Sequence, residues 1–276
     1  MKFLSKFYMA IIFIILYAPI IAVVVYSFNA SDSMSSFSGF SLKWYHELLK
    51  DETAITALQN SLFLAITSSL IATVIGTLAA FGIDRMRNKY VKSVINSVTN
   101  IPMMNPDIVT GVSMMLLFVA AAGILHLPNA LGRMSMLIAH VTFNLPYVIL
   151  SVLPKFSQMD PHLSEAALDL GCTPTQTFFK VELPSVVPGI VAGLMLGFTL
   201  SLDDFVISHF VSSPDFVTLP LYVYNQTAHE VKYSMYALCT FIIVVVLVLL
   251  LLVNFFRGND WKSKKKVKKV KGVKAK

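Results

Sequence analysis

Three carboxylates stand inside long apolar stretches of this chain. Asp107 follows a Pro-Met-Met-Asn-Pro run, and Asp203 and Asp204 stand between Leu202 and Phe205. A carboxylate inside a bilayer costs about 2.5–3.5 kcal/mol on insertion scales, so such a group indicates a functional site reached by water. Together with aromatic rings, carboxylates can hold an elongated organic cation through ion pairs and cation–π contacts. The predicted cation pathway comprises Asp107, Asp203, Asp204, Phe205, Phe143 and Tyr147.

The three carboxylates could line one outward-facing vestibule if each apolar stretch forms a continuous helix. A rise of ~1.5 Å per residue then puts Asp203 ~25 Å and Asp107 ~21 Å from the inner ends of their helices. Structural roles stay open: Asp203 and Asp204 could mark the wet end of a helix or cap a neighbour, and Asp107 could restart a helix. No cluster of Lys or Arg lies in these stretches. This argues weakly against anions and somewhat against neutral sugars, but leaves amino acids and metal chelates open.

The remaining residue types assemble no catalytic or metal centre. The sequence holds no Gly-x-x-x-x-Gly-Lys-Ser/Thr phosphate loop, so we do not expect it to bind ATP in the usual P-loop way. Its six His residues are scattered, without a His-Glu-x-x-His arrangement. Cys172 and Cys239 are expected to be unpaired packing residues. We therefore predict a protein without enzymatic activity, metal or cofactor of its own.

A polar hairpin, residues 160–184, interrupts the apolar stretches. Asp160 can cap a helix that starts at Pro161, and Gly171 can end that helix. A second helix follows at once, opened by a Thr-x-x-Gln capping box, and Pro184 is expected to limit its length. The sequence thus predicts two short helices that meet at the glycine.

The first helix of this hairpin has the form of a docking surface. Ala166 and Ala167 carry almost no side-chain bulk, so another protein could approach the backbone closely, and Glu165 offers one charge for orientation. An ordinary loop with two amphipathic turns is the alternative that the local pattern leaves open.

Composition indicates that the rest of the chain lies in a bilayer. The chain is 56% hydrophobic and 13% charged, with a mean hydropathy of +0.71, whereas soluble domains are about half apolar and about a quarter charged. A spanning helix needs roughly 20 apolar residues. Six windows qualify, at about Phe7–Phe28, Gln59–Ile83, Ser93–Ala122, Met134–Leu153, Val186–Phe210 and Met235–Phe256. The predicted fold is an all-α integral membrane protein with six transmembrane helices.

The distribution of Lys and Arg orients these helices. With the N-terminus inside, 18 of the 22 Lys and Arg residues fall on the inner side, and positive loop residues tend to stay cytoplasmic. Without the basic tail the split is still 8 to 4. Both termini and the polar hairpin are therefore predicted to be cytoplasmic, which implies a cytosolic partner for the hairpin.

The hairpin resembles the EAA loop of ABC importer permeases. Glu-Ala-Ala at residues 165–167, Gly171 after three residues, and a Val-x-Leu-Pro run after nine more match that motif, with Val181 where Ile is commoner. Both residues are β-branched and apolar, so the departure is mild. The resemblance implies the type I importer permease fold. It assigns coupling to an ATPase to Glu165, Ala166, Ala167, Gly171, Leu183 and Pro184.

This resemblance also implies the partners. Two permease subunits form the pathway, and each inserts its EAA helix into a cleft on a cytosolic ABC ATPase subunit. Two ATPase copies bind ATP and Mg, and their closure switches the pathway by rigid-body movement. Glu165 would orient the contact, the two alanines would permit it, and Gly171 would make the bend.

Three further segments resemble the spermidine/putrescine importer permeases, in particular their C-type membrane subunit. These segments are Met103–Val109, His140–Pro146 and Phe198–Phe205. The resemblance implies import of polyamines through the plasma membrane of a bacterium. It also implies an extracytoplasmic polyamine-binding protein and a second, homologous permease subunit, while no nucleic-acid partner is expected.

The chain is predicted to have three parts. Residues 1–56 hold the first transmembrane helix and an external segment, in which an amphipathic turn from Trp44 is expected to shield the outer rim. Residues 57–256 form the five-helix permease core, with the cytoplasmic coupling loop at 154–185. Residues 257–276 form a basic cytoplasmic tail that is expected to associate with lipid.

Two alternative functions stay open. An ABC importer permease for another small cationic or neutral solute would keep the hairpin and change only the pathway. A stand-alone secondary transporter or channel would tolerate buried acids, but it predicts transport without ATP and typically an internal repeat, of which we find no clear sign. Co-purification with an ATPase and a second permease discriminates between these classes.

Overall fold

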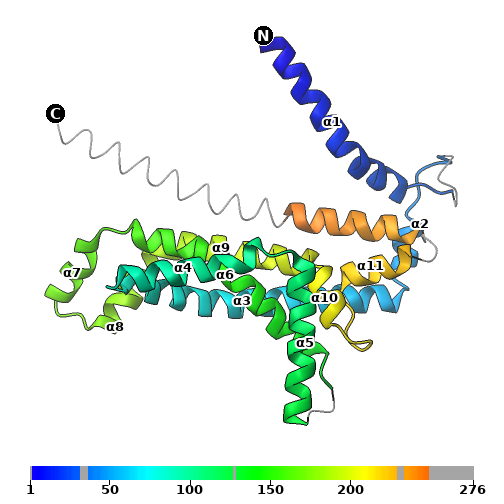
Figure 1. Cartoon of the computed structure of the whole chain (residues 1–276). Helices are drawn as coiled ribbons and strands as arrows, with labels where there is room; N and C mark the ends of the chain where they lie inside the picture. Colours follow the sequence, from blue (N-terminus) through cyan, green and yellow to red (C-terminus); the bar gives the residue numbers. More distant parts are fainter. Residues whose placement is uncertain (1, 32–36, 127–128, 229–232, 249–276) are drawn as a thin grey trace. The chain divides into compact units, whose positions relative to one another are not determined.

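The structure is a computed structural model that describes residues 2–31, 37–126, 129–228 and 233–248. Within these residues the secondary structure is helical, apart from two isolated β-bridges. The chain divides into two compact units (Figure 1): Ala57–Tyr222 forms one, and the described residues on either side of it form the other. The prediction of an all-α fold is confirmed.

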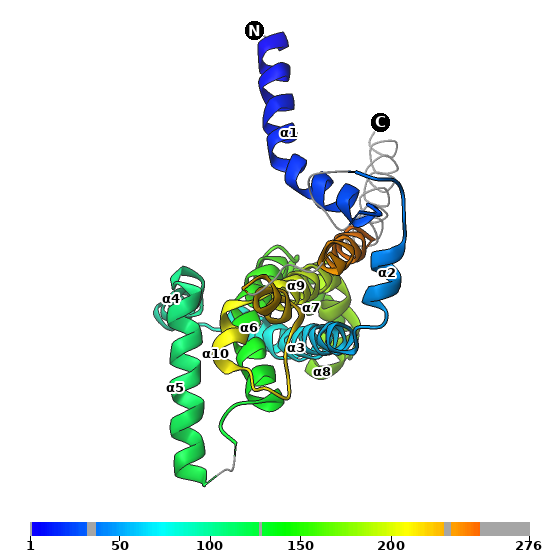
Figure 2. The same ribbon diagram turned by 90° about the vertical axis from the view of Figure 1, so that its right-hand side faces the viewer.

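Long helices dominate the unit Ala57–Tyr222. Its elements are α3 (Glu52–Arg85, which begins before the unit), α4 (Lys89–Met104), α5 (Asp107–Leu125), α6 (Arg133–Ser157), α7 (Pro161–Asp169), α8 (Pro174–Thr177), the π-helical turn η1 (Phe178–Glu182), α9 (Leu183–Asp203), α10 (Val206–Val211) and α11 (Leu219–Thr227, which continues past the unit). Helices α3, α6 and α9 run side by side in Figure 1, and Figure 2 views them nearly end-on. The hairpin helices α7 and α8 lie at one end of them.

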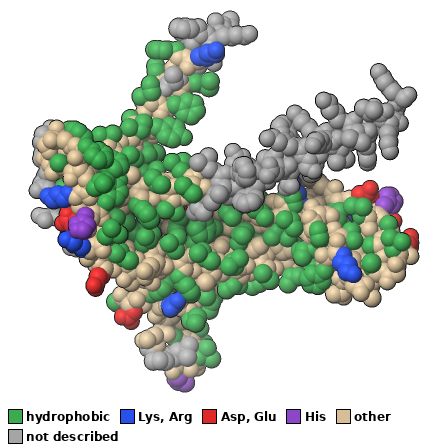
Figure 3. All heavy atoms as spheres, turned by 180° about the vertical axis from the view of Figure 1, so that it is seen from behind, with side chains coloured by type: hydrophobic (Ala, Val, Ile, Leu, Met, Phe, Trp, Pro, Cys, Tyr) green, Lys and Arg blue, Asp and Glu red, His purple; other side chains and the backbone are tan. Residues whose placement is uncertain are grey.

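Five described helices are long and apolar enough to cross a membrane. They are Lys6–Ser27, Glu52–Arg85, Asp107–Leu125, Arg133–Ser157 and Pro174–Asp203. Ser234–Val248 forms a shorter apolar helix, and the end of the sixth predicted span lies outside the described residues. Hydrophobic side chains cover much of the face shown in Figure 3. Exposed apolar residues such as Val74 and Leu78 on α3 suit contact with lipid tails.

The third predicted span, Ser93–Ala122, is wrong as a single helix. Helix α4 ends at Met104 and α5 begins at Asp107. A proline disfavours the α conformation in the residue before it, and Asn105 accordingly is extended, with ψ of 142°. Asp107 therefore stands in the first turn of a new helix, so its predicted depth along one continuous helix does not apply.

The fifth predicted span, Val186–Phe210, is also divided. Asp204 is extended, with ψ of 121°, and separates α9 from α10. Its carboxylate accepts hydrogen bonds from the backbone N–H groups of Ile207 at 3.3 Å and Ser208 at 2.8 Å. These bonds satisfy N–H groups that have no partner within the first turn of a helix. The alternative of a capping carboxylate therefore describes Asp204.

Pro184 does not limit the second helix of the hairpin, and that prediction is wrong. Helices α8, η1 and α9 follow one another without a break from Pro174 to Asp203. The backbone N–H of Leu183 donates to the carbonyl of Phe178, five residues back, so a π turn precedes the proline. Pro184 then occupies the first turn of α9, where a missing N–H is tolerated.

Glycines on α9 allow close packing against α6. Gly189, Gly193 and Gly197 recur one turn apart and face α6. A Cβ on Gly189 would lie 2.9 Å from the carbonyl oxygen of Ser151, and one on Gly193 would lie 3.2 Å from Cα of Val148. Membrane helices need such close approach, because lipid tails leave no hydrophobic force between the helices.

A buried hydrogen-bonded layer joins α6 to α9 and α3. Asn144 Nδ2 donates to Ser201 Oγ at 2.7 Å, and Ser201 Oγ lies 3.0 Å from Ser68 Oγ. All three side chains are buried. Hydrogen bonds between membrane helices contribute on average about 0.6 kcal/mol each. We infer that this layer serves the alignment of the three helices more than their stability.

The second unit contains α1 (Lys2–Ser27), α2 (Lys43–Leu48) and the apolar helix Ser234–Val248. The predicted amphipathic turn is α2. Trp44 Nε1 donates to the Asn29 carbonyl at 2.7 Å, and the Tyr45 hydroxyl lies 2.9 Å from Ser27 Oγ. These bonds hold α2 against the end of α1.

Gly189→Ala should destabilise the folded protein, because its Cβ would displace the Ser151 carbonyl and the Lys155 side chain, whose Cγ would be 2.7 Å away. Overpacking of this kind costs about 1–3 kcal/mol. Gly82→Ala on α3 is a matched control, since a Cβ there meets nothing within 4 Å and alanine favours the helix. Thermal unfolding in nanodiscs measures both, and equal midpoints for the two variants would contradict the packing account.

Candidate functional site

Both helices of the α7–α8 hairpin, residues 160–184, start at side-chain caps. Asp160 accepts a hydrogen bond from the backbone N–H of His162 at 3.1 Å, and Pro161 follows at the first helical position. Thr173 and Gln176 form a reciprocal capping box: the Thr173 N–H donates to Gln176 Oε1 at 3.1 Å, and the Gln176 N–H donates to Thr173 Oγ1 at 3.3 Å. Because caps satisfy N–H groups without other partners, short helices become possible here.

Helix α7 ends at the predicted glycine. Gly171 has a φ of +85°, a left-handed conformation that glycine adopts without strain. Its N–H donates to the Leu168 carbonyl at 2.9 Å, and the N–H of Cys172 donates to the Ala167 carbonyl at 3.1 Å. These are the two bonds of a Schellman motif. The direction in which the chain leaves α7 is therefore set by its own backbone.

Helix α7 has an outer and an inner face. Glu165 and Ala166 are exposed, whereas Ser164 and Ala167 are buried. Successive positions on a helix lie about 100° apart, so two adjacent alanines cannot share one face. Ala166 can be approached from outside, while Ala167 packs inward.

Large apolar side chains are exposed on this hairpin. Leu163 and Leu168 on α7, Leu170 at its end, and Phe179 on η1 all protrude, and Leu170 is 86% exposed. Leu163 and Leu170 share a face of α7 with Ala166 by helical spacing. These side chains give the hairpin an exposed apolar surface.

The charge on the outer face is paired within α7. Glu165 Oε2 lies 3.0 Å from His162 Nδ1, and both side chains are largely exposed. The hydrogen bond that His162 donates to Glu165 raises the pKa of His162 above its ordinary value, and the negative charges of Asp160 and Glu165 act in the same direction. A partner that uses the Glu165 carboxylate therefore competes with His162.

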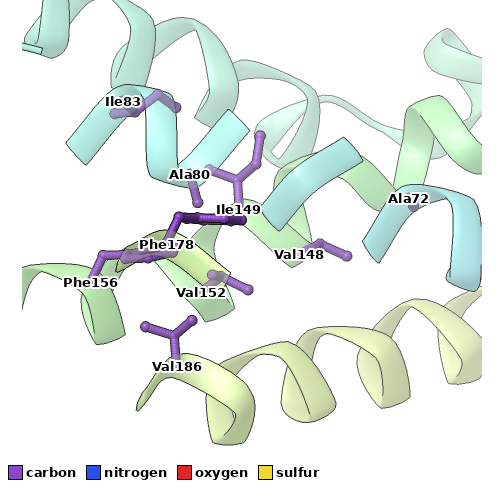
Figure 4. Packing of buried hydrophobic residues seen from close by; sticks show 9 residues of the cluster. All are labelled: Ala72, Ala80, Ile83, Val148, Ile149, Val152, Phe156, Phe178 and Val186. Carbon is purple, nitrogen blue, oxygen red and sulfur yellow. The ribbon is translucent and has the colours of Figure 1, made fainter. Parts of the chain in front are cut away.

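The hairpin rests on an apolar cluster that reaches from η1 to α3, α6 and α9. Figure 4 shows Phe178 beside Phe156, with Val152 and Val186 next to them. Leu183 packs against the same cluster, while Pro184 is exposed. Of the motif's closing Leu-Pro pair, the leucine thus anchors the hairpin and the proline faces outward.

Glu182 is a site residue that the sequence did not single out. Its side chain is almost completely buried, accepts a hydrogen bond from Ser164 Oγ at 2.8 Å, and forms an ion pair with Arg85. Buried carboxylates persist only when paired. The available signal was spacing: Phe178, Glu182 and Val186 recur at four-residue steps and are all buried, so one charge interrupts an apolar stripe.

The three predicted pathway carboxylates lie in different settings. Asp107 is exposed in the first turn of α5, and Asp203 is exposed at the last residue of α9. The Asp204 side chain is 7% exposed, caps α10 and lies 3.6 Å from His140 Nε2. Asp107 and Asp203 can therefore meet a solute, whereas Asp204 is engaged within the protein.

The predicted aromatic partners differ in the same way. Phe143 is buried and meets the half-buried Tyr147 edge-on, with ring centroids 5.5 Å apart. The half-buried Phe205 ring lies 5.4 Å from the ring of His209. Tyr147 and Phe205 offer accessible ring surface, whereas Phe143 supports Tyr147 from within.

Metal ligands do not gather in the part of the chain that the structure describes, where no group of three His, Cys, Asp or Glu could hold an ion. Cys172 and Cys239 are free thiols.

Comparison with known proteins identifies the family. The family described as binding-protein-dependent transport system inner membrane component matches residues 72–259. The putrescine transport system permease protein PotI of Escherichia coli (strain K12) is 38% identical over 231 residues, which cover 84% of this chain and 82% of that protein. The spermidine/putrescine transport system permease protein PotC of the same organism is 37% identical over 238 residues, covering 86% and 88%.

Solved structures share the fold. The crystal structure of a bacterial ABC transporter involved in the import of the acidic polysaccharide alginate matches with a TM-score of 0.73 and 18% identity, covering 92% of this chain and 94% of that chain. The fold is that of type I ABC importer permeases. The chain therefore belongs to the binding-protein-dependent transport system inner membrane component family, and it is a multi-pass permease subunit of an ABC importer rather than an enzyme.

Proposed function

We propose that this permease moves polyamines, putrescine or spermidine, into a bacterial cell across its plasma membrane. The observation that carries the proposal is the match to two permeases named for putrescine and spermidine/putrescine transport, each over more than four-fifths of this chain. The exposed carboxylates at the ends of α5 and α9 are consistent with a cationic solute.

The proposed complex contains four further chains. Two copies of a cytosolic ATPase bind ATP and Mg, a second homologous permease completes the pathway, and an extracytoplasmic protein delivers the polyamine. A solved neighbour of this fold is an alginate ABC transporter in complex with a periplasmic protein bound to alginate pentasaccharide. That arrangement supports the expectation of a delivery protein.

The outer face of α7 is the proposed contact for the ATPase. Ala166 gives close access to the helix backbone, Leu163 and Leu170 supply apolar area, and Glu165 supplies charge. The inward-facing Ala167 and the Gly171 turn set the position of this face. The Leu-Pro pair would pass movement of α7 into α9, because Leu183 is packed against the apolar cluster at the base of the hairpin.

Asp107 and Asp203 are the proposed cation contacts. Both are exposed, so each could exchange water for an ammonium group without first breaking an internal ion pair. Tyr147 and Phe205 could add cation–π contact. Asp204 and Phe143 would act indirectly, through the α10 cap and through the Tyr147 ring.

Reconstitution of the complete transporter in proteoliposomes tests the function. With the delivery protein present, labelled putrescine or spermidine should accumulate only when ATP is supplied. Excess unlabelled polyamine should compete, whereas an amino acid or a neutral sugar should not. Accumulation without ATP, or competition by all solutes alike, would contradict the proposal.

Ala166→Trp should weaken ATPase binding and lower uptake, because a large ring on the outer face of α7 would block close approach. The fold should survive, since Ala166 is exposed. Gln158→Trp, at an exposed position in the turn before α7, is the control on the same side of the membrane. Co-purification of the ATPase with each variant is the measurement, and equal recovery with both would contradict the docking assignment.

Asp203→Asn should lower polyamine uptake and leave thermal stability unchanged, because it removes a charge at an exposed position. Asp204→Ala should instead lower the unfolding midpoint, since loss of a helix cap costs about 0.5–2 kcal/mol. Uptake and thermal unfolding are measured on both variants. If Asp203→Asn transports like the unmodified protein, Asp203 is not a cation contact.

A further inference from the structure

We propose that Glu182 is a positioning residue of the α7–α8 hairpin, whose buried carboxylate ties α7 to α3 so that hairpin and membrane helices move as one body. The inference rests on the proposed coupling role of the hairpin. It assigns a specific joint to that role, outside the residues of the EAA pattern described above.

The contacts of Glu182 come from three separate elements. Glu182 is the last residue of η1, Ser164 lies in the middle of α7, and Arg85 is the last residue of α3. The same carboxylate oxygen, Oε1, accepts from Ser164 Oγ at 2.8 Å and from Arg85 Nη2. One atom thus joins segments that are far apart along the chain.

The exposure of the two charges is unequal. The Glu182 side chain is 2% exposed, whereas the Arg85 side chain is 53% exposed. The arginine can return to water if the pair breaks, but the carboxylate cannot. A buried charge without its partner is strongly unfavourable, so the arrangement favours the joined state of α3 and η1.

Aromatic packing shields this joint. The Arg85 guanidinium carbon lies 5.4 Å from the centroid of the Phe81 ring, and the ring centroids of Phe81 and Phe178 of η1 are 4.6 Å apart.

Asp84, the residue before Arg85, makes further links. Its carboxylate accepts a hydrogen bond from Ser157 Oγ of α6 at 3.1 Å and lies 3.7 Å from Lys92 Nζ of α4. The inner ends of α3, α4, α6 and η1 are therefore linked to one another beneath the hairpin.

Helix α7 needs such a lateral tie. At its two ends the helix continues into short turns at residues 158–160 and 170–173, whose caps fix the ends of α7 but not its middle. Between those ends, Ser164 and Ala167 are its buried residues, and Ser164 is the one that donates to Glu182. A force applied to the outer face would rotate α7 about its ends unless this inner contact transmits it to α9 and α3.

Two spin labels can report the joint directly. We would place them at Leu168→Cys on α7 and Met86→Cys beside the end of α3, both exposed positions, in full-length protein carrying Cys172→Ser and Cys239→Ser. In nanodiscs the otherwise unmodified protein should give one narrow distance distribution. Arg85→Gln, Glu182→Gln and Ser164→Ala should each broaden it, and Arg87→Gln, at an exposed arginine two residues away, should not.

The assembled transporter gives the second readout. In Arg85→Gln and Ser164→Ala, polyamine uptake per ATP hydrolysed should fall below that of the unmodified transporter, because movement of α7 would no longer be passed fully to α3 and α9. Recovery of the ATPase should stay unchanged. Arg85→Gln combined with Glu182→Gln should be no worse than Glu182→Gln alone, because both remove the same tie.

Narrow, unmodified distance distributions in all three variants would overturn the proposal. So would a loss of uptake that merely follows loss of the bound ATPase, since that result would mean a role in docking. The distance measurement needs neither a polyamine nor a partner chain. If the unmodified transporter fails to move polyamines while the variants still broaden the distribution, the proposed substrate is wrong and the joint stands.

Discussion

Backbone contact between α6 and α9 is the constraint on which the rest of the structure depends. In lipid, apolar side chains gain little by leaving one apolar surrounding for another, so helices associate through close fit and hydrogen bonds. Three glycines on α9 supply the fit, and Asn144 with its serine partners supplies the hydrogen bonds. Because α9 continues back into η1 and α8, the position of α9 also decides where the hairpin lies.

The two faces of the hairpin carry different kinds of side chain. Its outer face carries the small, apolar and charged side chains that we propose as the ATPase contact, and its inner face carries residues that bind it to the membrane helices. Caps and a left-handed glycine keep α7 short and well defined without help from a large core. A helix of nine residues can then act as a firm contact, although helices of that length are marginal in isolation.

Local features of the fold could be predicted from sequence, and features that depend on distant partners could not. The Asp160 cap, the capping box at Thr173 and the turn at Gly171 each involve neighbours within a few residues. The prediction that Pro184 limits the second hairpin helix is wrong, because a π turn upstream lets the helix continue through the proline. The role of Glu182 cannot be predicted from local sequence, because its main partner, Arg85, is 97 residues away.

The hydropathy pattern of the sequence does not predict the structural settings of the three carboxylates. Asp107, Asp203 and Asp204 stand out in the sequence as charges among apolar residues, but the apolar pattern around them predicts continuous helices. The helix breaks at Asn105 and Asp204 changed their settings. A carboxylate that caps α10 and one that ends α9 look alike in sequence, since the backbone angle of a single residue separates the two roles.

Because of the π turn at Phe178–Glu182, the rotation of the hairpin about the helix axis depends on the number of residues in that turn. A π turn holds one residue more than an α-helical turn would, so its removal would rotate everything before it by about 100° around the helix axis. Deleting one residue from the π turn would leave a regular α-helix. It would also rotate α8 away from α7 and move Phe178 out of the apolar cluster. The number of residues between Gly171 and Val181, nine, therefore sets how the hairpin is rotated relative to the membrane helices. Most side chains in that stretch are exposed, so substitutions there should be tolerated, whereas insertions or deletions should not.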